Sequence, residues 1–160
     1  MTEIVLPGHL RARVLTTAQE TEGHFDLVDT EMPPGAATPL HLHTQYEERL
    51  WVLEGSLLVH CGTERVELTS GDFYRIPRNT PHMIRSAEGA RALAISSPAA
   101  FAELLMRGGV PAGEGMPDGV FDPELFARIS AELGDQILGP PGTNPHEADV
   151  LVEHAEGGHR

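Results

Sequence analysis

The sequence predicts an all-β domain, a small antiparallel barrel, followed by a short helical extension on its C-terminal side. The 160 residues suit a single domain with one core. Its 17 glycines and 13 prolines imply many turns and disfavour a bundle of long helices. The first 97 residues break into short extended runs, and helical periodicity begins only after Ser97.

Eight extended runs follow one another at a spacing of about ten residues, as in an antiparallel sandwich or barrel. In chain order they are RARVLTTA, HFDLVDTEM, RLWVLEG, SLLVHCG, RVELTSG, DFYRIP, HMIRS and RALAIS. Glycine, proline and small polar residues separate them. Two links are short enough for hairpins: we expect tight turns at Glu54-Gly55 and from Cys61 to Glu64, because such turns need residues that tolerate positive φ.

Two helices are expected after the barrel. In the first, Phe101 and Leu104 begin an apolar pattern with helical spacing. In the second, Asp122 is the expected N-cap, Pro123 the first helical residue and Gly134 the residue that ends the helix. The glycine- and proline-rich stretch between the two helices is expected to be an irregular connection.

These features divide the chain into three parts. Residues 1–97 are the predicted barrel, and residues 98–139 are a helical extension that packs on it. Residues 140–160 carry many turn formers and acids and few apolar residues. We therefore expect them to form a flexible tail.

The charge of the chain disfavours several classes of partner. Its net charge is 11 − 24 = −13, and every basic residue is an arginine. Nucleic acids and anionic membranes require clustered positive charge, so we expect neither as a partner. No stretch approaches the ~20 apolar residues of a membrane span, and the first residues lack a secretory signal pattern, so we expect a cytoplasmic protein. The single cysteine, Cys61, lies in an apolar run and is expected to be a small buried residue.

Three of the nine histidines have a spacing that suggests chemistry. His41 and His43 are separated by one residue, so a strand would present both on one face. Glu48 follows at the start of the next run, and His82 comes later. Three imidazole nitrogens and one carboxylate suit a divalent transition metal, whereas calcium or magnesium would require more oxygen ligands. The alternative is that these are scattered core or surface histidines, and Glu47 competes with Glu48 as the carboxylate.

The same residues resemble the first motif of the cupins, a family of small metal-binding β-barrels. That motif is G-x5-H-x-H-x3,4-E-x6-G, and Gly35, His41, His43, Glu48 and Gly55 match every fixed position. The six residues between the glutamate and the last glycine select Glu48 over Glu47.

A second cupin motif, G-x5-P-x-G-x2-H-x3-N, resembles residues 71–86 with two changes. Gly71, Pro77 and His82 match it, whereas Asn79 replaces the second glycine and Ser86 the final asparagine. Asparagine also tolerates the left-handed backbone that the turn needs. The resemblance covers about residues 27–97.

The resemblance implies a jelly-roll barrel of the double-stranded β-helix type and one bound divalent transition metal. Its ligands would be His41, His43, Glu48 and His82, and nickel, iron, manganese, cobalt, zinc and copper all stay open as the ion. Two ligand positions of an octahedral ion would be free for substrate, dioxygen or water.

Strand alternation predicts an apolar cavity beside these ligands. Met32, Leu50, Val52 and Ile84 would form its wall, which favours an aromatic or polyketide-like guest over a sugar phosphate. The helix from Phe101 onward would either cover the mouth of the barrel or pack on its outside.

Trp51 and Leu53 alternate to the opposite face of the same strand and would contact a second layer or another copy of the chain. Because related barrels commonly pair through one face, we expect a homodimer. His60 lies on an apolar run and is expected to be a core or cavity-wall histidine. The other five histidines, His9, His24, His146, His154 and His159, are expected at the surface.

The C-terminal segment is similar to that of bacterial proteins grouped with quercetin 2,3-dioxygenases. This resemblance implies a dioxygenase that acts on a flavonol-like or other polyphenolic molecule, in which Glu48 is both ligand and catalytic base. Two alternatives stay open. One is a polyketide cyclase or isomerase that uses the metal as a Lewis acid, and the other is a cupin that binds a small molecule without catalysis.

Overall fold

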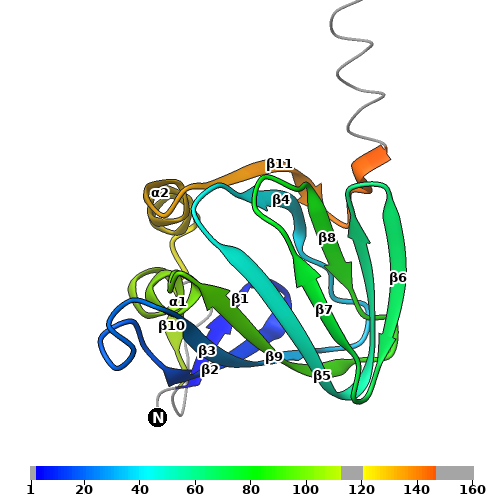
Figure 1. Cartoon of the computed structure of the whole chain (residues 1–160), viewed down its shortest axis with the longest axis horizontal. Helices are drawn as coiled ribbons and strands as arrows, with labels where there is room; N and C mark the ends of the chain where they lie inside the picture. The colour runs from blue at the N-terminus through cyan, green and yellow to red at the C-terminus, as the bar shows by residue number, and fades with distance from the viewer. Residues whose placement is uncertain (1–2, 113–120, 147–160) are drawn as a thin grey trace, which may run out of the picture.

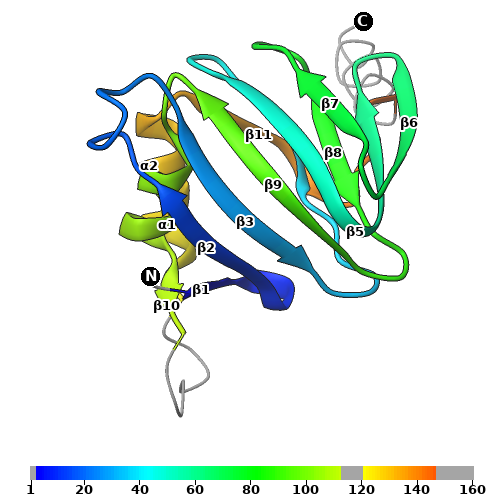
Figure 2. The same ribbon diagram turned by 60° about the horizontal axis from the view of Figure 1, so that its bottom comes forward.

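The structure is a computed structural model that describes residues 3–112 and 121–146. Its strands form an antiparallel jelly-roll barrel with two facing sheets (Figures 1 and 2). The strands of the first sheet are, in order, β10 (Val110–Pro111), β1 (Glu3–Leu6), β2 (Leu10–Thr16), β3 (Asp26–Met32), β9 (Ala90–Ser97), the first half of β5 (Glu47–Cys61) and β7 (Phe73–Ile76). A short 3-10 helix, η1 (Pro7–His9), connects β1 to β2.

The second sheet faces the first and contains the other strands of the barrel. It contains β11 (Asp135–Pro141), β4 (Pro39–His43), β8 (His82–Arg85), the second half of β5 and β6 (Glu64–Thr69). Two helices, α1 (Phe101–Gly108) and α2 (Pro123–Glu132), lie side by side at one end of the barrel (Figure 2). Helix α1 packs on β2 and β3, and α2 packs on β11.

The strand β5 belongs to both sheets, and here the expected hairpin turn at Glu54-Gly55 is wrong. The chain does not reverse there but continues as one strand of 15 residues. Glu54 and Gly55 still pair with β9, and the register shifts between Val52 and Glu54. Gly55 has a φ of 74°, and a Cβ at this position would overlap the carbonyl oxygen of Gly89. The positive φ that the sequence suggests therefore produces a bend between the sheets instead of a turn.

The other expected local features are confirmed. Cys61 pairs with Glu64 across a tight hairpin between β5 and β6. Asn79 has a φ of 57°, the left-handed conformation expected of it. The Asp122 carboxylate accepts hydrogen bonds from the backbone N–H groups of Glu124 and Leu125, so it caps α2 as expected.

The last strand, β11, differs from the expected division of the chain. Residues 135–141 were expected at the end of a helical extension and the start of a flexible tail, but they pair with β4. Beyond them, the Gly142 N–H donates to the Thr38 carbonyl. Because β11 pairs on one side only among the described strands, it tolerates prolines that an inner strand would exclude. Residues 147–160 of the expected tail lie outside the described residues.

Apolar side chains from both sheets fill the barrel. The main core cluster includes Met32, Leu50, Val52, Leu57, Val59, Ile76 and Ile84. The start of α1 is attached to this barrel by Asp26 of β3, whose Oδ2 accepts hydrogen bonds from the N–H groups of Ala100 (2.8 Å) and Ala102 (2.9 Å). Since Ala100, the N-cap of α1, has no side-chain oxygen to offer, Asp26 replaces the missing cap.

The outer face of the first sheet carries both an ion-pair network and exposed apolar groups. Asp29 accepts hydrogen bonds from Arg91 and Arg13, and these bonds lower the pKa of its carboxyl group. Trp51 is 48% exposed and Leu53 partly buried. Pairing of two chains through this face stays a prediction. Of the two helices that the structure describes, neither is long and apolar enough to cross a membrane.

We expect Gly55→Ala to destabilise the barrel more than Gly71→Ala. Both glycines have positive φ, so either alanine costs roughly 1–2 kcal/mol. Only at Gly55 would the new Cβ overlap backbone atoms, whereas no atom lies within 4 Å of a Cβ at Gly71. Gly55→Ala should therefore lose a further ~1–3 kcal/mol in urea unfolding of the metal-free protein. Equal losses for the two variants would contradict the close approach of β5 to Gly89.

Candidate metal centre

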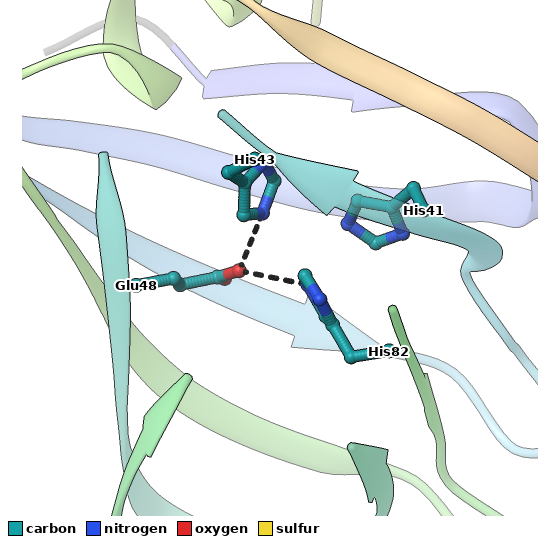
Figure 3. A group of neighbouring side chains, drawn as sticks. All are labelled: His41, His43, Glu48 and His82. Atoms are coloured by element: carbon teal, nitrogen blue, oxygen red, sulfur yellow. Dashed lines mark hydrogen bonds and ion pairs between the residues drawn. The ribbon is translucent and has the colours of Figure 1, made fainter. Parts of the chain in front are cut away.

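The structure brings together the four side chains that the motifs select, and they come from both sheets (Figure 3). His41 and His43 project from the same face of β4, and His82 of β8 pairs in register with His41. Glu48 reaches them from the first half of β5, across the barrel. One ligand atom from each residue lies within 4.8 Å of the others.

The Nδ1 atom of each imidazole is held by a hydrogen-bond acceptor. His41 Nδ1 donates to the carbonyl oxygen of Pro39 (2.7 Å), and His82 Nδ1 donates to that of Thr80 (2.9 Å). The third ring, His43, donates from Nδ1 to the carboxylate of Asp135 (2.7 Å). Because Nδ1 carries a proton in each case, Nε2 is the atom left to face the centre of the cluster.

Two of the Nε2 atoms lie close to one oxygen, Oε2 of Glu48. His43 Nε2 lies 3.1 Å from it and His82 Nε2 lies 3.5 Å from it. In the part of the chain that the structure describes, the buried His82 Nε2 has no hydrogen-bond partner. A buried polar nitrogen without a partner is costly, and a cation between the rings and the carboxylate would satisfy it. The residues present therefore fit a metal ion.

The protonation states favour metal binding at two of the residues and oppose it at a third. Burial and the neighbouring charges of His82 and His43 lower the pKa of His41 to about 3, which leaves this ring neutral. Burial would raise the pKa of Glu48, but its contacts with His43 and His82 hold that pKa well below the usual range. Burial would lower the pKa of His43, yet hydrogen bonds to Asp135 and Glu48 outweigh it and raise the pKa to about 9. A cation at Nε2 of His43 would thus displace a proton.

The donor set defines the class of ion. Three imidazole nitrogens and one carboxylate oxygen suit manganese, iron, cobalt, nickel, copper and zinc. Calcium and magnesium take more oxygen ligands than this cluster offers. Glu47, the alternative carboxylate, points elsewhere and accepts a hydrogen bond from Arg75.

An apolar cavity of about 390 Å³ opens beside the cluster. Three of the four predicted wall residues, Met32, Leu50 and Ile84, line it; Val52 is buried in the core instead. No described lining residue is a lysine or arginine, and the only carboxylates are Glu48 and Asp135. Arg75 and Arg85 do not line the cavity: Arg75 bonds to Glu47, and Arg85 bonds to the Gly142 carbonyl.

Both helices contribute to this cavity. Phe101 and Leu104 of α1 and Phe126 of α2 are among its lining residues, together with Phe121 before α2. The rings of Phe121 and Phe126 lie 5.5 Å apart. Of the two alternatives for the first helix, a cover over the mouth of the barrel and packing on its outside, these lining residues favour the cover.

Sequence patterns missed three residues that support the cluster. Asp135 accepts hydrogen bonds from His43, from the Tyr46 hydroxyl (2.8 Å) and from the Ser130 hydroxyl (2.9 Å). Tyr46 also stacks on His43, with ring centroids 4.3 Å apart. None of the three belongs to a metal-binding spacing, and the only sequence signal is an aspartate directly after the glycine that ends α2.

The remaining histidines that the structure describes lie outside the cluster. His60 is buried on β5, in agreement with a core position. His9, His24 and His146 are exposed, and His154 and His159 lie outside the described residues. Cys61 is buried with a free thiol, as expected.

Comparison with known proteins identifies the family. Residues 28–96 match the family model described as the cupin domain. Among solved structures, an RmlC-like cupin from Shewanella frigidimarina has a TM-score of 0.56 at 24% identity and covers 64% of this chain and 89% of that chain. Ectoine synthase from P. lautus has a TM-score of 0.57 at 21% identity and covers 72% and 85%. At these identities the likeness shows the fold alone, and the family match shows that residues 28–96 are a cupin domain.

Two curated relatives are similar over part of their length. Quercetin 2,3-dioxygenase of Bacillus subtilis is 31% identical over 81 residues, which are 51% of this chain and 24% of that protein. An uncharacterized protein of Methanocaldococcus jannaschii is 38% identical over 60 residues, which are 38% of this chain and 48% of that protein. The match thus spans about a quarter of the first relative and about half of the second.

Metal uptake should depend on the clustered histidines and not on others. We expect wild type to hold about one divalent transition metal per chain by elemental analysis, because the cluster offers one set of donors. His41→Ala and His82→Ala each remove a donor and should lose most of the metal. His24→Ala, which changes an exposed histidine outside the cluster, should keep it. Full occupancy in both cluster variants would show that the ion binds elsewhere.

Proposed function

We propose that the chain is a metal-dependent dioxygenase that acts on a flavonol-like or other aromatic, polyphenolic small molecule. The observation that carries this proposal is the position of the donor cluster at one wall of an apolar cavity whose described lining residues include no lysine or arginine. A volume of about 390 Å³ lies within the range of pockets that enclose small organic ligands.

The charge of the cavity restricts the substrate class. A phosphate or a molecule with several carboxylates would need arginine or lysine partners, and no described lining residue is either. Phe101, Phe121 and Phe126 instead offer aromatic surface in the lining of the cavity. A largely apolar molecule with one or two metal-binding oxygens fits this combination.

The dioxygenase activity is carried over from a relative. The name of the Bacillus subtilis protein states its reaction on quercetin, and the aligned part covers only 24% of that protein. The proposal of the same activity for this chain therefore rests on the cupin domain and the cavity.

Each group of residues at the site would have its own role in the reaction. His41, His43, His82 and Glu48 would hold the ion, which when bound supplies Lewis acidity and a site for dioxygen. The Glu48 carboxylate is the group within the cluster that we assign to accept the proton of a substrate hydroxyl. The Tyr46 hydroxyl is given no role in proton transfer, because it already donates its hydrogen bond to Asp135. The aromatic and aliphatic side chains of α1 and α2 would keep water away from the reacting ring.

Oxygen consumption tests this function against its alternatives. Metal-loaded protein should consume dioxygen in the presence of one or more members of a panel of flavonols and simpler polyphenols, measured with an oxygen electrode. Protein treated with a chelator is the control. Turnover of an aromatic or polyketide substrate without oxygen uptake would instead support a cyclase or isomerase, and binding without turnover a non-catalytic cupin.

Glu48→Gln should reduce activity far more than metal occupancy. The amide is nearly isosteric and retains one oxygen, but it cannot accept the proton. Loss of a general base commonly costs ~100 to 10,000-fold, so the metal-saturated variant should stay at least about a hundredfold slow. Glu47→Gln is the matched control, because Glu47 bonds to Arg75 away from the cluster. If both variants behaved alike, Glu48 would not be the base.

A further inference from the structure

Asp135 connects the C-terminal segment to the donor cluster. It is 8% exposed and lies on β11, where it pairs in register with His43 of β4. Its Oδ1 accepts hydrogen bonds from His43 Nδ1 (2.7 Å) and the Tyr46 hydroxyl (2.8 Å), and its Oδ2 accepts one from Ser130 of α2 (2.9 Å). This carboxylate is therefore held on three sides while it contacts one ligand of the cluster.

We propose that Asp135 is a positioning residue that fixes the orientation and the donor strength of His43 toward a bound metal ion. The proposal rests on the proposed function only in requiring that the cluster binds a metal. A carboxylate on the far nitrogen of a ligating histidine fixes its tautomer and makes the ligand more basic. Tyr46 supports the same orientation, since its ring stacks on His43 at an interplanar angle of 26°.

The three histidines are not held in equivalent ways. His41 and His82 donate from Nδ1 to neutral carbonyl groups two residues earlier in the chain. His43 alone donates to an anion, and that anion comes from a residue 92 positions away. The identity of the acceptor thus singles out His43 as the ligand whose donor strength depends on another part of the fold.

Charge balance gives a second argument for a carboxylate at position 135. A divalent cation with Glu48 alone would leave a net positive charge beside an apolar cavity. The described lining residues include no other anion that could offset it apart from Asp135. With both carboxylates the centre is neutral, which lowers the cost of placing the ion in a poorly solvated site.

The test compares Asp135→Asn with a second buried aspartate of the barrel. The asparagine keeps the size of the side chain and an oxygen that can accept from His43 Nδ1, but it removes the charge. The control is Asp29→Asn, which removes the charge of another buried carboxylate, hydrogen bonded to Arg13 and Arg91 on the outer face. Metal affinity is measured by competition with a chromophoric chelator, and the ligand field by the visible absorption of the cobalt(II) form.

Asp135→Asn should bind metal about 10- to 100-fold more weakly and shift the cobalt(II) bands, with an unchanged circular dichroism spectrum. Asp29→Asn should melt earlier yet keep wild-type affinity and bands. Should Asp135→Asn fail to fold, Ser130→Ala removes one of the bonds that orient the carboxylate and should still weaken metal binding several-fold.

The positioning role would be overturned if Asp135→Asn showed unchanged affinity and unchanged cobalt(II) bands. The same holds for Ser130→Ala where that variant has to replace it. Neither result would contradict metal binding by the cluster. Equal weakening in Asp29→Asn would also overturn it, because the effect would then come from general destabilisation. If wild type itself took up no metal, the proposed function and this inference would both be wrong.

Discussion

The architecture depends on the passage of one strand, β5, through both sheets. Its first half carries Glu48 in the first sheet, and its second half pairs with β8, the strand of His82. The relative position of carboxylate and imidazole is therefore set within a single continuous strand and its neighbour. The bend at Gly55 makes this possible, since the chain there passes directly against the Gly89 carbonyl. A side chain at this position would push β5 away from Gly89 and the start of β9.

Much of the site was predictable because its residues lie at short, fixed distances along the chain. His41 and His43 share a strand face by alternation, and the spacing to Gly55 distinguished Glu48 from Glu47. Both helices were predictable from local signals as well, with Asp122 and Pro123 at the start of α2. Each of these features depends on a few neighbouring residues, which is the range over which sequence patterns carry information.

The features that escaped prediction depend on distant parts of the chain. β11 contains Gly139, Pro140 and Pro141 and shows no clean alternation, so only its pairing with β4 makes it a strand. Asp135 has no motif of its own, and its role follows from that pairing. At Glu54-Gly55 the glycine does have the positive φ that the sequence suggests. Whether a positive φ reverses a strand or only bends it depends on the partner strand, here β9. Val52 is buried in the core, yet it is not among the residues that line the cavity.

The place of β11 in the chain has a consequence for folding during synthesis. The ribosome releases the N-terminal strands first, so His41, His43, Glu48 and His82 all emerge before β9, α2 and β11 exist. Until the nascent chain reaches Asp135, β4 has no partner on one edge and His43 lacks its carboxylate acceptor. Long-range pairings of this kind form late, because the loop between the strands must first close. The histidine strand β4 is thus completed by the last strand that the structure describes.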